Sequence, residues 1–163
     1  MSKQGGFSLV ELITVMVVLG ILSAVALPRI TNNSAFIGAA FNADVVSALR
    51  YAQKSAVSHR RLVCATLTPT TVTLSMAKNN PDTSCTIGAP LSSPDGSPYQ
   101  SKDGSIQAIS YPGYPAPWLL YFQPAGTITS DGAGVSIYSA VNITITGRPT
   151  TPINVQGATG YVQ

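Results

Sequence analysis

The sequence predicts an α+β fold in which a long amino-terminal α-helix, membrane-spanning in its first half, packs on an antiparallel β-sheet domain. An almost wholly apolar run over residues 7–27 begins the helix. Helical spacing of apolar residues returns over residues 36–57. From residue 62 onward, short β-rich runs alternate with turns rich in Gly, Pro, Ser and Thr. We therefore expect a leader over 1–6, an apolar helix over 7–27, the second half of that helix over 28–61 and a β-rich domain over 62–163.

The apolar run is long enough to cross a membrane, because its 21 residues span about 31 Å at 1.5 Å per residue. Lys3 precedes the run, so we expect the short leader in the cytoplasm and the bulk of the chain outside it. Charged residues make up only 9% of the chain, whereas they make up about a quarter of typical soluble domains. The net charge of +3 is too small to indicate nucleic acid binding by itself.

Glu11 is the only glutamate in the chain, and it is the fifth residue of the apolar run. A carboxylate at membrane depth is expensive and by default indicates a functional site. Two other interpretations stay open. The run is an ordinary secretory signal cleaved near Ala24-Val25-Ala26, or it is a plain anchor whose Glu11 extends to the membrane interface. An ordinary signal core is shorter, about 7–15 residues, and has no use for a glutamate.

The sequence Gly6-Phe7-Ser8-Leu9-Val10-Glu11 resembles the cleavage and methylation motif of type IV prepilins and of the pseudopilins of type II secretion. The resemblance implies that a prepilin peptidase cuts between Gly6 and Phe7 and N-methylates Phe7. It also implies that Glu11 of an incoming subunit faces the Phe7 ammonium of a neighbour. In a low dielectric such a pair is strong, and it sets register more than it adds stability.

The same resemblance implies the partners and the location of the protein. The partners are other pilin subunits, the prepilin peptidase and N-methyltransferase, and an inner-membrane assembly platform. The protein would first lie in the bacterial inner membrane with its amino terminus in the cytoplasm. It would then move into a periplasmic or extracellular filament, where the apolar helix forms the filament core.

Two positions are expected to loosen the long helix. Pro28 lacks a backbone donor and should kink it, and Gly20 is a second soft point. The alternative for Pro28 is a simple helix end, with residues 36–57 forming a separate amphipathic helix. In either case one apolar stripe should pack on the sheet: Val45, Leu49, Ala52 and Ala56.

The strand pattern begins with a predicted hairpin over residues 62–68 and 71–76, separated by Pro69-Thr70. Residues 77–105 look like a long loop, because they contain several Pro, Asn, Asp and Gly turn signals. Further strands are expected at 105–110, 118–123, 134–139, 141–146, 152–156 and 160–162.

Cys64 and Cys85 are the only two cysteines. If the domain lies outside the cytoplasm they should pair, and the bond would fasten the 77–105 loop to the first strand. The alternative is two buried free thiols. Neither cysteine has the spacing of a metal or redox site.

A weaker resemblance covers the rest of the chain. Ala52-Gln53-Lys54-Ser55-Ala56, Phe122-x-Pro124-x-Gly126 and Gly160-Tyr161-Val162 are similar to the H/FimT-like group of minor pilins and pseudopilins. Ala26-Leu27-Pro28-Arg29 is similar to pilins of the mannose-sensitive haemagglutinin type. These resemblances imply a minor pilin of a type IV pilus, with a type II secretion pseudopilin or a DNA-uptake or adhesive tip pilin as alternatives.

The sequence offers little for catalysis, so we expect no catalytic residues, no cofactor and no metal. The single histidine, His59, lies near a predicted helix end, where a cation favours the helix dipole. Asp95, Asp103 and Asp131 each precede a glycine, which is turn chemistry. A Ca²⁺ site built from such loops is the alternative.

DNA binding is a further alternative. It would use basic side chains to contact the backbone of the nucleic acid and aromatic side chains as stacking faces: Tyr99, Tyr111, Tyr114, Trp118 and Tyr121. The residues proposed for it are Arg50, Lys54, Arg60 and Arg61.

Overall fold

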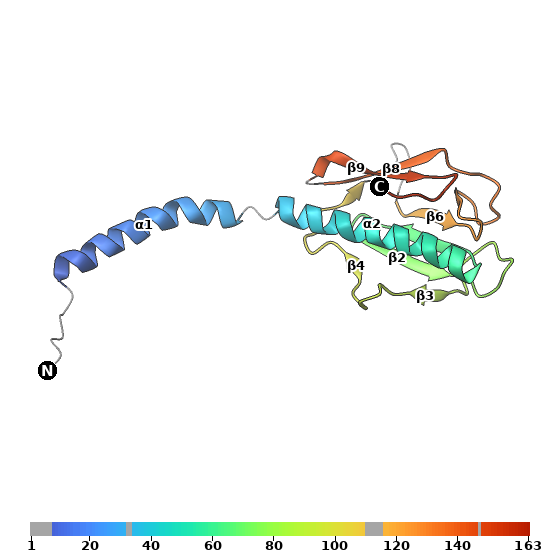
Figure 1. Ribbon diagram of the computed structural model, residues 1–163, viewed down its shortest axis with the longest axis horizontal. Coiled ribbons are helices and arrows are strands. Elements are labelled where there is room, and N and C mark those ends of the chain that lie inside the picture. Colours follow the sequence, from blue (N-terminus) through green and yellow to red (C-terminus); the bar gives the residue numbers. More distant parts are fainter. Residues whose placement is uncertain (1–7, 32–33, 110–115, 147) are drawn as a thin grey trace. The chain divides into compact units, whose positions relative to one another are not determined.

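A computed structural model describes residues 8–31, 34–109, 116–146 and 148–163 (Figure 1). The chain divides into two units between Asn33 and Ser34. Among these residues, the first unit contains one helix, and the second contains a helix and two antiparallel sheets. The predicted α+β class and its antiparallel sheet are therefore confirmed.

Helix α1 (Leu9–Thr31) forms the described part of the first unit. It stays helical through Gly20 and for three residues beyond Pro28, so the helix does not end at the proline. A kink at either position remains a prediction. Within the part of the chain that the structure describes, no helix combines the length and the hydropathy that a membrane span requires.

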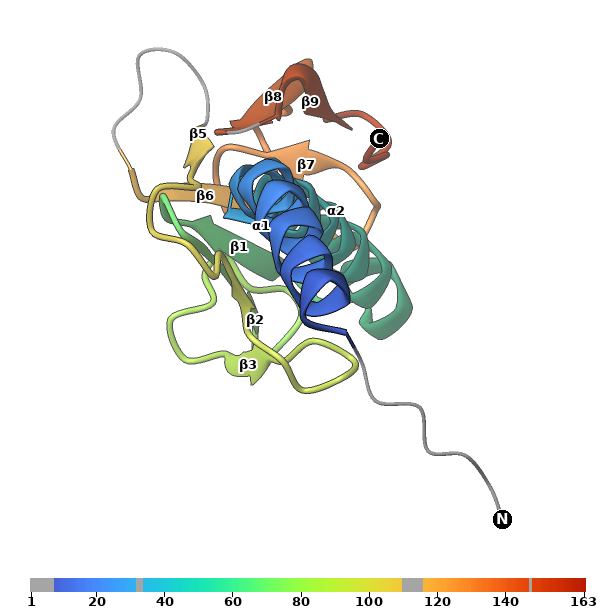
Figure 2. The same cartoon turned by 90° about the vertical axis from the view of Figure 1, so that its left-hand side faces the viewer.

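Helix α2 (Ser34–His59) belongs to the second unit, and it contacts strands of both sheets (Figure 1 and Figure 2). The predicted stripe is confirmed, because all four of its side chains are fully buried. Phe41 extends the stripe toward the start of the helix. Small residues such as Ala52 and Ala56 let the helix backbone approach the sheets closely.

The end of α2 is closed by a left-handed residue. Arg60 has a φ of 52°, its N–H donates to the Val57 carbonyl, and the Arg61 N–H donates to the Ala56 carbonyl. This pair of bonds is the Schellman arrangement, in which the left-handed position is usually glycine. His59 lies in the last turn as predicted.

The larger sheet has the order β3-β2-β1-β6-β7, and β4 also pairs with β2. The predicted hairpin is confirmed as β1 and β2, and β6 pairs with the other side of β1. Two short strands, β3 and β4, lie within the segment predicted to be a loop. The bounds are β1 (Val63–Leu67), β2 (Thr71–Met76), β3 (Ala89–Leu91), β4 (Tyr99–Gln100), β6 (Trp118–Phe122) and β7 (Ile128–Thr129).

The smaller sheet has the order β5-β8-β9, with β8 antiparallel to both neighbours. Its apolar residues, among them Val141, Ile143 and Val155, join the same core as α2 and the larger sheet. The bounds are β5 (Ala108–Ile109), β8 (Ala140–Ile145) and β9 (Arg148–Gln156). The strand predicted at 160–162 is a single bridge between Val155 and Val162.

The strand predicted at 134–139 is wrong. The segment forms bends and makes one isolated bridge, between Ile137 and Thr129. The reason is the Asp131 carboxylate, which accepts the backbone N–H groups of Val135 and Ser136 at 3.1 and 2.6 Å. A side-chain acceptor therefore takes the amides that a strand would have used in its ladder.

Candidate functional site

The described chain starts with a helix cap. Ser8 precedes α1, and its Oγ accepts the backbone N–H of Glu11 at 3.2 Å. Glu11 is the third helical residue, so Ser8 and Glu11 have the spacing of a capping box. We did not predict the cap, although Ser-x-x-Glu before an apolar run is its sequence signal.

The Glu11 carboxylate lies in the first turn of α1, where the helix macrodipole favours negative charge. Within the described residues, the carboxylate makes no hydrogen bond and no salt bridge to the chain. The Glu11 carbonyl accepts the Thr14 hydroxyl at 2.9 Å, which places polar groups on successive turns of an otherwise apolar segment.

Large apolar side chains surround Glu11 on every side of α1, and they are exposed in the isolated chain. Their exposed fractions run from 51% at Ile13 to 73% at Leu9. A helix that is apolar all round is normally buried in a core or in a membrane. The exposed set is Leu9, Val10, Leu12, Ile13, Val15, Met16, Val17, Val18, Leu19, Ile21 and Leu22.

The two predicted processing residues, Gly6 and Phe7, lie outside the described residues. They immediately precede Ser8 in the sequence, and α1 begins at Leu9. The side chain of Pro28 is likewise outside the description. Gly20 is described, and a Cβ added there would meet no other atom within 4 Å.

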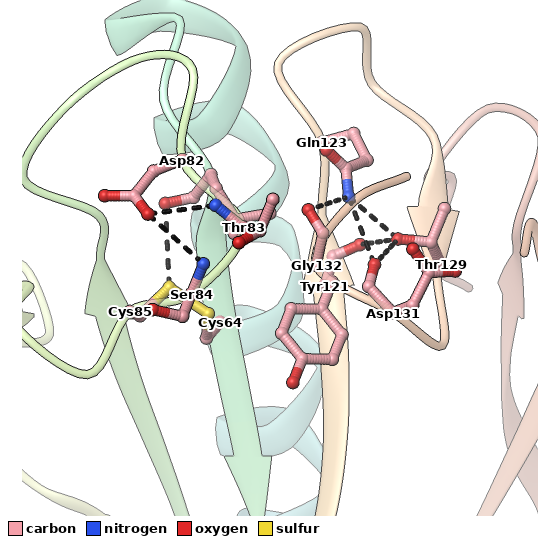
Figure 3. Close-up of a disulfide and its surroundings, with 11 residues drawn as sticks. Cys64, Asp82, Thr83, Ser84, Cys85, Tyr121, Gln123, Thr129, Asp131 and Gly132 are labelled. Atoms are coloured by element: carbon pink, nitrogen blue, oxygen red, sulfur yellow. Dashed lines mark hydrogen bonds between the residues drawn. A yellow bond between two sulfur atoms is a disulfide. The ribbon is translucent and has the colours of Figure 1, made fainter. Parts of the chain in front are cut away.

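The predicted disulfide between Cys64 and Cys85 is present, with Cα atoms 6.1 Å apart (Figure 3). Cys64 lies in β1, and Cys85 lies in the loop between β2 and β3. The bond therefore joins the loop to a central strand, and the alternative of two free thiols is excluded. Asp82 orders the same loop by accepting the backbone N–H groups of Thr83 and Ser84.

The four basic residues predicted as a DNA-binding set differ in their contacts and positions. Arg50 donates through Nε and Nη2 to the carbonyl of Val162, at 3.1 and 3.0 Å. It thereby ties the carboxyl-terminal segment to α2. Lys54 lines a small cavity of about 450 Å³ with Arg50, whereas Arg60 and Arg61 follow the end of α2.

Each of the three aspartates that precede a glycine accepts hydrogen bonds from residues close to it in sequence. Hydrogen bonds from Ser93 and Ser97 lower the pKa of Asp95, and those from Ser105 lower the pKa of Asp103. Backbone N–H groups of Val135 and Ser136 lower the pKa of Asp131.

The alternative of a Ca²⁺ site finds no support in the arrangement of acidic residues. In the described ranges, no three His, Cys, Asp or Glu residues group as metal ligands.

The amino-terminal part of the chain is similar in sequence to known proteins. Residues 1–27 match the prokaryotic N-terminal methylation motif. Two fimbrial proteins of Pseudomonas aeruginosa are each 35% identical to this chain over 69 residues, which cover 42% of this chain. The match spans 45% of each relative, so less than half of their length is represented. No solved structure matches. The amino-terminal part of this chain therefore carries a methylation motif and is similar to the corresponding part of fimbrial proteins.

Proposed function

We propose that this protein is a structural subunit, a minor pilin, of a type IV pilus. It is made as a prepilin, cleaved after Gly6, N-methylated at Phe7, and assembled into a helical filament or at its tip. The observation that carries the proposal is the methylation motif followed by a helix that exposes apolar side chains on all sides. No catalytic role is assigned to any residue.

The exposed apolar side chains of α1 require a cover from outside the helix. Burying a large apolar side chain is worth about 1.5–3 kcal/mol, so eleven of them are a strong force for insertion or assembly. We propose that the inner membrane covers them first, with the amino terminus in the cytoplasm. Neighbouring helices then cover them in the filament, and extraction from lipid requires work from an assembly platform.

Glu11 would fix the register of that assembly. Its carboxylate has no partner among the described residues, and an unpaired carboxylate in an apolar core is strongly disfavoured. Cleavage after Gly6 would create an ammonium four residues upstream on every subunit. Pairing this ammonium with Glu11 of a neighbouring subunit neutralises both charges, and it penalises any stagger that separates them.

The second unit would be carried on the outside of the filament. It has its own apolar core, built from α2 and both sheets, and a disulfide suited to an oxidising compartment. Its integrity therefore does not require the burial of α1. This division lets one helix change its surroundings from lipid to protein while the domain stays folded.

The test compares filament incorporation of the Glu11→Gln variant with that of the wild type. The substitution removes the charge but keeps the backbone N–H that donates to Ser8. We expect normal cleavage and a reduced amount of the variant in sheared filaments. Ser23→Ala is the matched control, because Ser23 is a polar residue of α1 whose hydroxyl donates to the Leu19 carbonyl of the same helix. Equal incorporation of wild type and Glu11→Gln would refute the pairing.

A type II secretion pseudopilin would use the same amino-terminal segment. Deletion of the gene separates the two roles, since a pilin mutant loses surface filaments whereas a pseudopilin mutant loses protein secretion. DNA uptake is less well supported, because Arg50 is already engaged by the carboxyl-terminal segment.

A further inference from the structure

The first turn of α1 fixes the start of the helix at a defined residue. The backbone N–H of Glu11 lies 3.1 Å from the carbonyl oxygen of Ser8 and 3.2 Å from its Oγ. The Leu12 N–H donates to the same carbonyl at 3.2 Å. These are the contacts of an N-cap residue, whose carbonyl accepts the first helical bond and whose side chain accepts an N–H of the first turn. Ser8 is therefore the cap, and the helix begins at Leu9.

The cap uses a donor that a longer helix would need. In a continuous α-helix each N–H donates to the carbonyl four residues before it. If α1 began further upstream, the Glu11 N–H would donate to the Phe7 carbonyl, and the Val10 N–H would donate to the Gly6 carbonyl. Two oxygen atoms of Ser8 accept the Glu11 N–H instead, so winding Phe7 into the helix would break both of these contacts.

Apolar surroundings give the cap its importance. A backbone N–H without a partner is costly in lipid, so a helix in a membrane gains by recruiting upstream carbonyls as acceptors. A local side-chain acceptor removes that gain because it satisfies the N–H where the helix starts. Ser8 is the only hydroxyl side chain between Ser2 and Thr14, so no neighbouring residue supplies the same acceptor.

The bond proposed for cleavage lies between Gly6 and Phe7, directly before the cap, within the segment that matches the methylation motif. Hydrolysis adds water across this bond, which leaves a carboxylate on Gly6 and an ammonium on Phe7. The Gly6 carbonyl oxygen takes up negative charge during the reaction and needs donors from the peptidase. A helix would engage this oxygen itself, whereas an extended backbone offers its polar groups to a partner.

We propose that Ser8 is a positioning residue for prepilin cleavage. Its cap fixes the start of α1, so the Gly6 carbonyl stays free of helical hydrogen bonds and accessible to the peptidase. The inference rests on the proposed function, because it concerns the same cleavage. It gives Ser8 a role before cleavage, whereas the role proposed for Glu11 begins with assembly.

The test is pulse–chase conversion of the full-length precursor in cells that contain the peptidase, with the cleavage point read from the mass of the product. Ser8→Ala removes the Oγ acceptor, so we expect conversion about 3- to 10-fold slower than that of the wild type. Ser8→Gly also lacks the hydroxyl, but glycine is a far better N-cap than alanine, so we expect conversion close to that of the wild type. Ser23→Ala is the control, because its hydroxyl contacts the Leu19 carbonyl, away from the bond.

A second measurement follows the start of the helix without the peptidase. It uses the uncleaved full-length precursor in detergent micelles, and it records the ¹³Cα chemical shift of Phe7 by NMR. We expect Ser8→Ala to move this shift toward helical values, and Ser8→Gly and Ser23→Ala to leave it unchanged. Loss of a direct contact between Ser8 and the peptidase would not move the shift.

Three results would overturn the proposal. The first is equal conversion of the wild type and Ser8→Ala. The second is conversion of Ser8→Gly that is as slow as that of Ser8→Ala, because the peptidase would then recognise the hydroxyl directly. The third is slow conversion of Ser8→Ala without a helical shift at Phe7. A wild-type precursor that is not cleaved after Gly6 would refute the proposed function instead, so the two failures are distinguishable.

Discussion

Gly132 lies directly against the carbonyl group of Thr83, so close that a Cβ on the glycine would come within 1.7 Å of the carbonyl oxygen. Figure 3 shows the two residues beside the disulfide, on loops that are 49 positions apart in sequence. Because Thr83 is two residues before Cys85, this contact and the disulfide position the same loop. The close approach explains why a residue without a side chain is needed at position 132.

Gly132→Ala is therefore expected to destabilise the protein by about 1–3 kcal/mol, the usual effect of inserting a methyl group into a filled space. Chemical denaturation measures the change. Gly104→Ala is the matched control, because a Cβ at Gly104 meets nothing within 4 Å. Equal stability of the two variants would show that the loops can separate without loss.

Removing the disulfide should lower the free energy of unfolding. Cys64 and Cys85 are 21 positions apart, and closing a loop of that size contributes about 3 kcal/mol in the chain-entropy model. The Cys64→Ala/Cys85→Ala variant and reduced wild-type protein should both show this loss in urea unfolding. A loss below about 1 kcal/mol in both would mean that the packing of the loop, without the disulfide, is sufficient to stabilise the fold.

Arg60→Gly is expected to stabilise the protein by about 0.5–1 kcal/mol, because Arg60 holds the left-handed position that closes α2. Thermal unfolding measures the gain. Arg60→Ala separates the charge from the backbone, since it removes the guanidinium but keeps a Cβ at a φ of 52°. If Arg60→Ala stabilises as much as Arg60→Gly, the gain in stability comes from the loss of the charge and not from the relief of the left-handed backbone.

Acid is expected to destabilise the turn that follows β7, because it protonates Asp131. Hydrogen bonds from Val135 and Ser136 hold the pKa of Asp131 below its ordinary value of 3.8. A lowered pKa in the folded state means that the stabilisation is complete above pH 3.8 and is lost as the pH falls through the lowered value.

The amide NMR signals of Val135 and Ser136 should follow this titration, with a midpoint below 3.8. Asp131→Asn should abolish the transition. A midpoint at or above 3.8 would contradict the role of these two bonds.

Strong local signals in the sequence predicted much of the fold. The period of Val45, Leu49 and Ala52 was sufficient to locate the buried face of α2. The β-rich composition of the two runs on either side of Pro69-Thr70 located the hairpin of β1 and β2. Cys64 and Cys85 were the only candidates for a disulfide once an extracellular domain was expected. Each of these predictions depends on periodicity, on composition or on counting, which needs no knowledge of tertiary contacts.

The errors arose where side chains compete with the backbone or where contacts are distant. Asp131 removes two amides from a segment whose composition favours a strand. β7 has only two residues, too few for a period to appear. The hydrogen bond from Arg50 to the Val162 carbonyl joins residues 112 positions apart. Composition alone could not reveal it, so Arg50 remained a candidate for DNA binding.

The most direct measurement is the mass of the mature amino-terminal peptide, isolated from filaments or from the membrane fraction. We expect a peptide that begins at Phe7 and carries one methyl group on its amino nitrogen. A peptide that begins at Leu27, as an ordinary secretory signal would leave, or an unprocessed start at Met1, would refute processing as a prepilin. In either case Glu11 would have no ammonium to meet on a neighbouring subunit.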